Sequence, residues 1–208
     1  MALSQEDKEH FELKILAESV FKGKKKSYAR SLGPRFLTDR LGAEHKALRQ
    51  SFTNNILPSG ENMKYATPVI KYDRHGYKPR ERVLILTENA VYILDTLKTF
   101  KLKHRLPYKA IKELVVTRES DNLLIVRIPP ELKKDKGDLI LEVPHIIEAL
   151  TKAINITSNP NILKIVNTES VSHKLVGGKE GVIEVRTGTT PAISKNPQSG
   201  HLLVVASP

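Results

Sequence analysis

The sequence predicts a mixed α+β fold that is rich in strands: a barrel of about seven strands closed by one helix, with a helical extension before it and more strands after it. Three observations support this prediction. Short apolar runs recur at even spacing between residues 64 and 143, with turn residues between them. A run with helical spacing follows them. The hydrophobic fraction of 39% and the charged fraction of 27% are typical of a folded globular chain.

The first predicted element is a helix over residues 5–21, within a segment formed by residues 1–22. Ser4 and Asp7 have the spacing of a capping box, in which side chains bond the free backbone N–H groups at a helix start. Its apolar stripe would contain four side chains: Phe11, Ile15, Leu16 and Val20. This stripe favours packing against the core over a free partner-binding face.

Residues 23–62 form a helical and irregular extension. Glycine and proline residues interrupt its pattern, so only short helices are expected there, over residues 34–41 and 44–52.

Residues 63–157 contain the predicted barrel and its closing helix. Seven strands are expected, at residues 64–72, 82–87, 90–95, 100–106, 111–117, 123–128 and 138–143. In the fourth run, apolar residues and His104 alternate with basic residues, which predicts one charged face. Residues 144–156 keep helical spacing and would close the barrel.

Residues 158–208 carry weaker strand patterns, over residues 162–166, 173–176, 181–186 and 201–206. Four short strands bury too little surface for a domain of their own, so we expect an extension packed beside the barrel. The Pro-, Ser- and Gly-rich stretch at 188–200 is predicted to be a loop.

The net charge is +11, and basic residues concentrate in residues 22–35, 71–82 and 98–109. Charge gathered in this way attracts polyanions: acidic lipid headgroups, nucleic acid or acidic proteins. The chain has no cysteine, no apolar leader at its start and no apolar run long enough to span a bilayer. We therefore expect a chain of the cytoplasm, with the nucleus as a second compartment.

Motifs for catalysis, cofactors and metals are missing from the sequence. It contains no phosphate-binding loop of the G-x-x-x-x-G-K-[ST] type and no G-x-S-x-G turn. No two of its seven histidines are three or four residues apart, so no helical zinc pair exists. We expect no enzymatic activity, no cofactor and no metal site in these residues.

The most informative stretch is residues 71–82. His75-Gly76 predicts a turn between two strands, with Lys71 on the first arm and Arg80 and Arg82 on one face of the second. Arginine grips phosphate with a planar fork, and lysine adds a flexible point charge. Such a hairpin suits a ring that carries several phosphates, although a solvated hairpin with scattered charges would show the same pattern.

This pattern, followed by more strands and one helix, resembles a pleckstrin-homology domain with its phosphoinositide motif. Over residues 18–207 the chain further resembles the tail homology 1 region of class I myosins, of the myosin-Ic/Ih type. The segments that carry this resemblance are Val20-Phe21-Lys22-Gly23-Lys24-Lys25, Arg35-Phe36-Leu37, Arg40-Leu41-Gly42, residues 69–82, Leu86-Thr87-Glu88-Asn89-Ala90-Val91, Lys136-Gly137-Asp138 and Gly200-His201-Leu202-Leu203-Val204-Val205-Ala206.

The resemblance implies a membrane-docking tail that binds phosphatidylinositol 4,5-bisphosphate and other anionic phospholipids, so that an actin-based motor is linked to membrane. It implies headgroup-binding roles for Lys71 and Arg82. Arg80 completes the motif, and Arg74 and Lys78 flank it. His75 stands where close relatives often carry lysine, so its charge would depend on pH. A supporting basic surface would comprise Lys22, Lys24, Lys25, Lys26, Lys101, Lys103 and Arg105.

The resemblance also implies partners and a location. The expected location is the cytoplasmic face of the plasma membrane and the cell cortex. Calmodulin is expected near the N-terminal helix, and the chain is expected to be a monomer. ATP hydrolysis and actin binding are expected to belong to the motor of the family, outside these residues.

Two other functions remain open at this point. A nucleic-acid-binding module would fit the net charge, and residues 22–26 would suit a nuclear localisation patch. Aromatic residues are only 5% of the chain, however, and no base-stacking signature is present. A peptide or protein adaptor is the other alternative, because sheet edges of small barrels also bind peptides.

Overall fold

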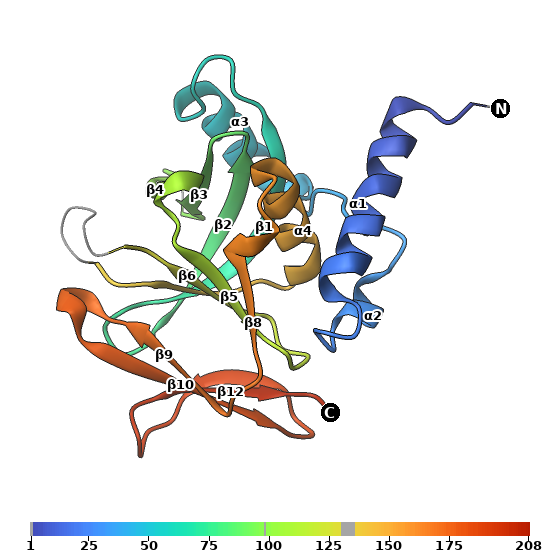
Figure 1. Ribbon diagram of the computed structural model, residues 1–208. Coiled ribbons are helices and arrows are strands. Elements are labelled where there is room, and N and C mark those ends of the chain that lie inside the picture. Colours follow the sequence, from blue (N-terminus) through green and yellow to red (C-terminus); the bar gives the residue numbers. More distant parts are fainter. Residues whose placement is uncertain (1, 98, 130–135) are drawn as a thin grey trace.

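The computed structural model describes residues 2–97, 99–129 and 136–208. It is a mixed α+β, strand-rich fold, as the sequence predicts. Two sheets lie one above the other, and helices cover the sides of the larger one (Figure 1). Among the described residues, no helix combines the length and the apolarity that crossing a bilayer requires.

The larger sheet has eight strands in the order β4-β3-β2-β1-β7-β6-β5-β8. Their bounds are β1 Met63–Tyr72, β2 Pro79–Thr87, β3 Ala90–Asp95, β4 Leu102–Pro107, β5 Glu113–Thr117, β6 Leu123–Arg127, β7 Leu139–Glu142 and β8 Leu163–Val166. The first seven strands pair antiparallel, and β8 pairs parallel to β5. Because β8 pairs with β5, residues 163–166 belong to the larger sheet and not to the C-terminal extension in which the sequence analysis placed them.

The smaller sheet has four strands in the order β11-β12-β10-β9. They are β9 Ser170–Lys174, β10 Glu180–Thr187, β11 Ala192–Lys195 and β12 Leu202–Ala206. Strand β11 lies in the stretch predicted to be a loop. Its residues are mostly exposed, so it lacks the apolar alternation by which a strand is recognised.

The described residues form the α-helices α1 Gln5–Phe21, α2 Tyr28–Ser31, α3 Lys46–Asn55 and α4 Ile146–Thr157. Short 3₁₀ turns are found at Ala43–His45, Tyr108–Ala110, Pro160–Ile162 and Val176–Gly178. Helix α1 begins at Ser4 with the predicted capping box. The helix expected over 34–41 is wrong: the chain there makes turns, and Leu37 has a positive φ of 68°.

Three apolar clusters hold the layers together. The inner face of the larger sheet packs against α4 and α1. Its outer face packs in one part against α3 and in another against the smaller sheet. Strands covered on both faces read as continuous apolar runs, which explains why β3 is buried at every position.

Candidate functional site

The candidate site lies at the end of the β1–β2 hairpin, on the inner face of the larger sheet. The strand register places Lys71 opposite Arg80, and Val69 opposite Arg82. Residues directly opposite in an antiparallel pair share a face, so all four side chains leave the sheet on the same side. Val69 belongs to the apolar cluster on the inner face of the larger sheet, so Lys71 and Arg82 also leave the sheet on its inner face. Such diagonal neighbours are about 7 Å apart.

Lys71 is a nearly buried ammonium group surrounded by other cations. Only 9% of the residue is exposed, and no described carboxylate forms an ion pair with it. Burial, together with the positive charges of Arg74 and Arg82, lowers the pKa of Lys71 to about 8, and the nearby carboxylate of Asp73 partly opposes this shift. A buried charge normally has a partner, so this lysine is suited to receive an anion.

Arg82 is held by one acidic neighbour that it shares. Its guanidinium lies 3.8 Å from Asp95 of β3, and the other oxygen of Asp95 lies 3.2 Å from Lys103. Arg82 also donates to the backbone carbonyl of Glu81 at 2.8 Å. Its buried Nε has no hydrogen-bond partner among the described residues. One carboxylate therefore serves two cations, and Arg82 keeps donor capacity for a ligand.

His104 and Lys136 also belong to this cluster, although the sequence did not identify them as site residues. His104 lies opposite Ile93, which belongs to the apolar cluster on the inner face of the larger sheet, so His104 is on that inner face too. Burial, together with the charges of Lys71, Arg74 and Lys136, lowers the pKa of His104 to about 3. His104 is therefore neutral near pH 7. The alternation over 100–106 places His104 on the face opposite the basic residues, so the charge pattern does not single it out as a site residue.

The turn between β1 and β2 forms the rim of the site. Arg80, Lys78 and His75 are exposed there. Asp73 organises the turn: its carboxylate accepts the backbone N–H of His75 at 3.1 Å and that of Lys78 at 3.2 Å. Arg80 forms a 3.5 Å ion pair with the same carboxylate. Arg80 therefore forms an ion pair with Asp73, whereas Lys71 forms no ion pair with a described carboxylate and feels Asp73 only as a nearby charge.

One more cation reaches the rim from the smaller sheet. Lys195 of β11 places its Nζ 3.6 Å from the position that a Cβ atom on Gly76 would occupy. No sequence signal could reveal this approach, because Lys195 lies in the stretch predicted to be a loop.

The first basic segment is a separate surface, and one of its lysines is not on the surface at all. Lys25 is 2% exposed, and its ammonium donates to the carbonyls of Thr117 and Glu119 at 2.9 and 2.8 Å. Its assignment to an exposed basic surface is therefore wrong. Lys22 and Lys24 are exposed.

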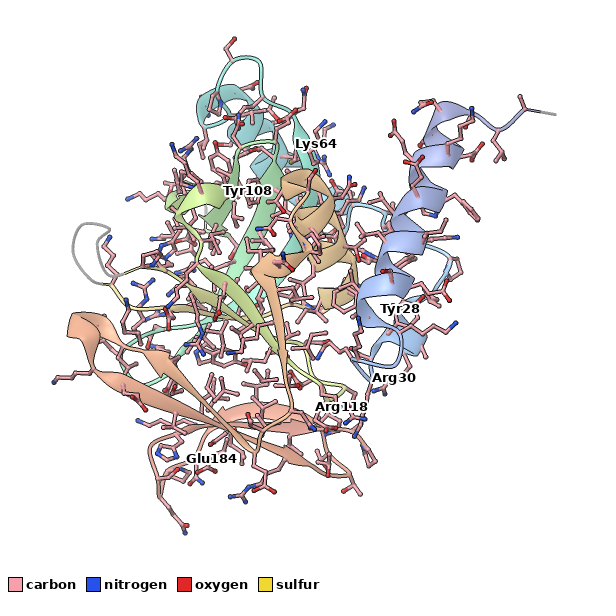
Figure 2. All side chains as sticks on the ribbon, viewed as in Figure 1. Tyr28, Arg30, Lys64, Tyr108, Arg118 and Glu184 are labelled. Atoms are coloured by element: carbon pink, nitrogen blue, oxygen red, sulfur yellow. The ribbon has the colours of Figure 1, made fainter. Side chains whose placement is uncertain are left out.

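The position of this segment also separates it from the hairpin. Lys26 is exposed and pairs with Glu119 at 2.5 Å. In the view of Figure 1, the end of α1 and α2 lie on the right, whereas the β1–β2 turn lies beside β9 on the left. Figure 2 places Arg30 and Arg118 on that right-hand side too. The first basic segment therefore cannot extend the hairpin site.

The second predicted surface segment, on β4, is divided. Lys101 is exposed. Lys103 is connected to the site by its ion pair with Asp95, the carboxylate that also lies near Arg82. Arg105 points to the other face of the sheet, where its Nε donates to the Tyr92 hydroxyl at 3.1 Å and its guanidinium lies over the Tyr92 ring. Only part of this segment is therefore available to the candidate site.

The geometry suits a ligand with several negative charges close together. Cations from β1, the β1–β2 turn, β2 and the end of the β6–β7 connection lie near one another on the inner face of the larger sheet, and a neutral imidazole lies among them. Charge-assisted hydrogen bonds to phosphate oxygens are the strongest contacts available to such groups. The described residues contain no group of three or more His, Asp and Glu side chains that could hold a metal ion.

Comparison with known proteins identifies the family. Residues 27–207 match the family described as unconventional myosin tail, actin- and lipid-binding. The chain is 44% identical over 207 residues to unconventional myosin IC of Drosophila melanogaster, covering 100% of this chain and 20% of that protein. It is 34% identical over 206 residues to unconventional myosin-Ih of Homo sapiens, covering 98% of this chain and 19% of that protein.

A solved structure, the linker-DH/PH domains of p115-RhoGEF, resembles the fold distantly. Its TM-score is 0.38 at 15% identity, covering 78% of this chain and 46% of that one. Membership of the family therefore depends on sequence alone.

These matches confirm the resemblance to the tails of unconventional myosins, and they make one correction. The chain spans about a fifth of the length of the curated relatives that it matches. The family description includes actin binding, so the expectation that actin is bound only outside these residues is wrong. The chain belongs to the unconventional myosin tail family, and it is an actin- and lipid-binding tail region.

Proposed function

We propose that the mouth of the barrel binds the headgroup of phosphatidylinositol 4,5-bisphosphate and, less tightly, other anionic phospholipids. Lys71, on β1, and Arg82, on β2, bind the phosphates of the headgroup. Arg74 and Lys136 add charge, and the exposed Arg80, Lys78 and His75 form the rim. The observation that supports this most is the nearly buried ammonium of Lys71, which has no carboxylate partner among the described residues.

The same proposal covers the finer architecture and the cellular role. We interpret β1–β7 with α4 as a pleckstrin-homology-like barrel, between an N-terminal helical extension and a C-terminal sheet. In the whole protein this region would attach an actin-activated motor to the plasma membrane and cortex. Calmodulin would bind next to α1, whose Phe11 and Ile15 are 60% and 53% exposed.

Vesicle co-sedimentation of two single variants, Lys71→Ala and Arg82→Ala, tests the pocket. Each variant removes charge-assisted contacts worth about 1.5–3 kcal/mol, so affinity for vesicles with phosphatidylinositol 4,5-bisphosphate should fall about tenfold or more. Alanine is preferred to glutamate at Arg82, because a glutamate would place a like charge opposite Asp95 on the neighbouring strand and destabilise the hairpin. Thermal unfolding of each variant checks that the fold is intact.

Matched variants control for the loss of one charge. Lys164→Ala and Arg186→Ala change exposed residues on β8 and β10 and should bind within twofold of the parent chain, since a single exposed charge contributes about 1 kcal/mol or less. Equal losses in all four variants would exclude a pocket and leave a diffuse basic surface. A preference for nucleic acid at matched salt, or binding of a peptide that displaces no lipid, would support the alternative functions.

A further inference from the structure

The β1–β2 turn, which carries the rim of the site, has an unusual backbone. Gly76 and Tyr77 both have positive φ angles, of 87° and 59°. Glycine takes this conformation freely, but a bulky residue in the left-handed region costs about 1–2 kcal/mol. Such a conformation persists only where surrounding contacts fix it. Something other than the local sequence must therefore hold Tyr77.

The contacts that hold Tyr77 come from the smaller sheet. The tyrosine is 7% exposed, and its ring packs in the apolar cluster between the two sheets. Its hydroxyl lies 2.6 Å from Nε2 of His173 on β9, and the two rings meet edge to face at 5.6 Å. Residues 77 and 173 are thus joined by a buried hydrogen bond between parts of the chain that are 96 residues apart.

The pair is tightly enclosed. His173 is 2% exposed. A Cβ atom on Gly181 of β10 would lie 2.5 Å from His173 and 2.8 Å from the Tyr77 hydroxyl, so only glycine leaves room for the bond. Burial lowers the pKa of His173, so it is neutral near pH 7. The hydrogen bond is therefore buried, and Gly181 packs closely against both of its partners.

We propose that Tyr77 and His173 are positioning residues of the lipid site: the smaller sheet holds the β1–β2 turn in the conformation that receives a phosphorylated headgroup. This inference rests on the proposed function. Neither residue touches the ligand. A turn that is already fixed pays less conformational entropy on binding, so its cations bind clustered phosphates more tightly. A membrane whose negative charge is spread over many lipids does not require a fixed turn. Binding to such a membrane should therefore not depend on Tyr77 and His173.

Three variants of the full chain test the proposal: Tyr77→Phe, His173→Leu and the double variant. Tyr77→Phe keeps the ring and removes only the hydroxyl. Each variant should lower affinity for vesicles with phosphatidylinositol 4,5-bisphosphate about three- to tenfold, which corresponds to ordering one or two side chains. Binding to phosphatidylserine vesicles of equal total charge should stay within twofold of the parent, and amide exchange in residues 73–78 should become faster.

The double variant separates positioning from general damage. If the pair acts as one unit, the double variant should lose no more affinity than the worse single variant. Additive losses, or equal losses on the two kinds of vesicle, would overturn the proposal. Unchanged affinity in all three variants would overturn it too. If the parent chain itself shows no preference for the inositol lipid, the proposed function fails first, which distinguishes the two ideas.

Discussion

Two adjacent lysines of the same basic run, Lys25 and Lys26, have opposite roles. Lys25 is buried, and its ammonium bonds two carbonyls at the end of β5. Lys26 is exposed and reaches only one surface carboxylate. Charge counting along a sequence cannot separate them, because burial at this position depends on how the segment after α1 packs against the β5–β6 turn.

Lys25→Met should lower the free energy of unfolding by about 2 kcal/mol, since it keeps the aliphatic stem but leaves two carbonyls without their donor. Lys26→Met is the matched control. It should change the free energy of unfolding by about 0.5 kcal/mol or less, because exposed ion pairs contribute little. Urea denaturation measures both. A larger loss in Lys26→Met than in Lys25→Met would contradict the assigned roles.

The proposed role of Lys71 predicts that headgroup binding depends on pH. Its pKa of about 8 in the free protein lies below the ordinary 10.5, and nearby phosphates should raise it again. Below pH 7 the amine is charged in both states. Above pH 8 the free protein must take up a proton to bind, so affinity should fall as pH rises, by at most about tenfold per pH unit.

Isothermal titration with a soluble inositol phosphate between pH 7 and about 9.5 measures this effect, in a range where phosphate groups are already ionised. Lys71→Arg is the control, because arginine stays charged over the whole range. The slope should disappear in that variant. A slope that survives unchanged would assign the titration to another group.

Among the elements, those with regular apolar patterns were predictable from sequence, and those defined by contacts were not. Strand β3 and helix α1 have the predicted bounds, because continuous apolar residues and a capping box are local signals. The apolar stripe of α1 was partly wrong. Phe11 and Ile15 are exposed, and Leu13, Ala17 and Phe21 are buried. The helix packs through small and large residues in alternate turns, which a plain apolar count does not detect.

Phe21→Ala and Phe11→Ala should therefore differ sharply in stability. Phe21 is fully buried in the inner core, so its truncation should lower the free energy of unfolding by roughly 3 kcal/mol or more. Phe11 is 60% exposed, and its truncation should change the free energy of unfolding by about 0.5 kcal/mol or less. Thermal or urea unfolding compares them. Equal destabilisation would mean that α1 packs through its other face.

Across the whole molecule, the sequence predicts the site residues on β1 and β2, but not the residues that other segments bring to the site. Lys71, Arg80 and Arg82 follow from period-two alternation across one turn. His104, Lys136 and Lys195 come from three other segments, and their approach depends on how the larger sheet curves and how the smaller sheet packs on it. The same packing brings His173 to Tyr77. The periodicity of a sequence describes only neighbouring residues, so it cannot reveal contacts between segments that are far apart in the chain.

Strand β8 has a consequence for how quickly the chain can fold. It pairs parallel to β5, so Leu163 lies beside Leu114, and the chain must complete β6, β7 and α4 before that ladder can form. Contacts between residues so distant along the chain require loop closure before they give any stabilisation. During synthesis the antiparallel hairpins can therefore assemble early. We expect the packing of the smaller sheet on the larger one, which involves strands beyond β8, to follow later.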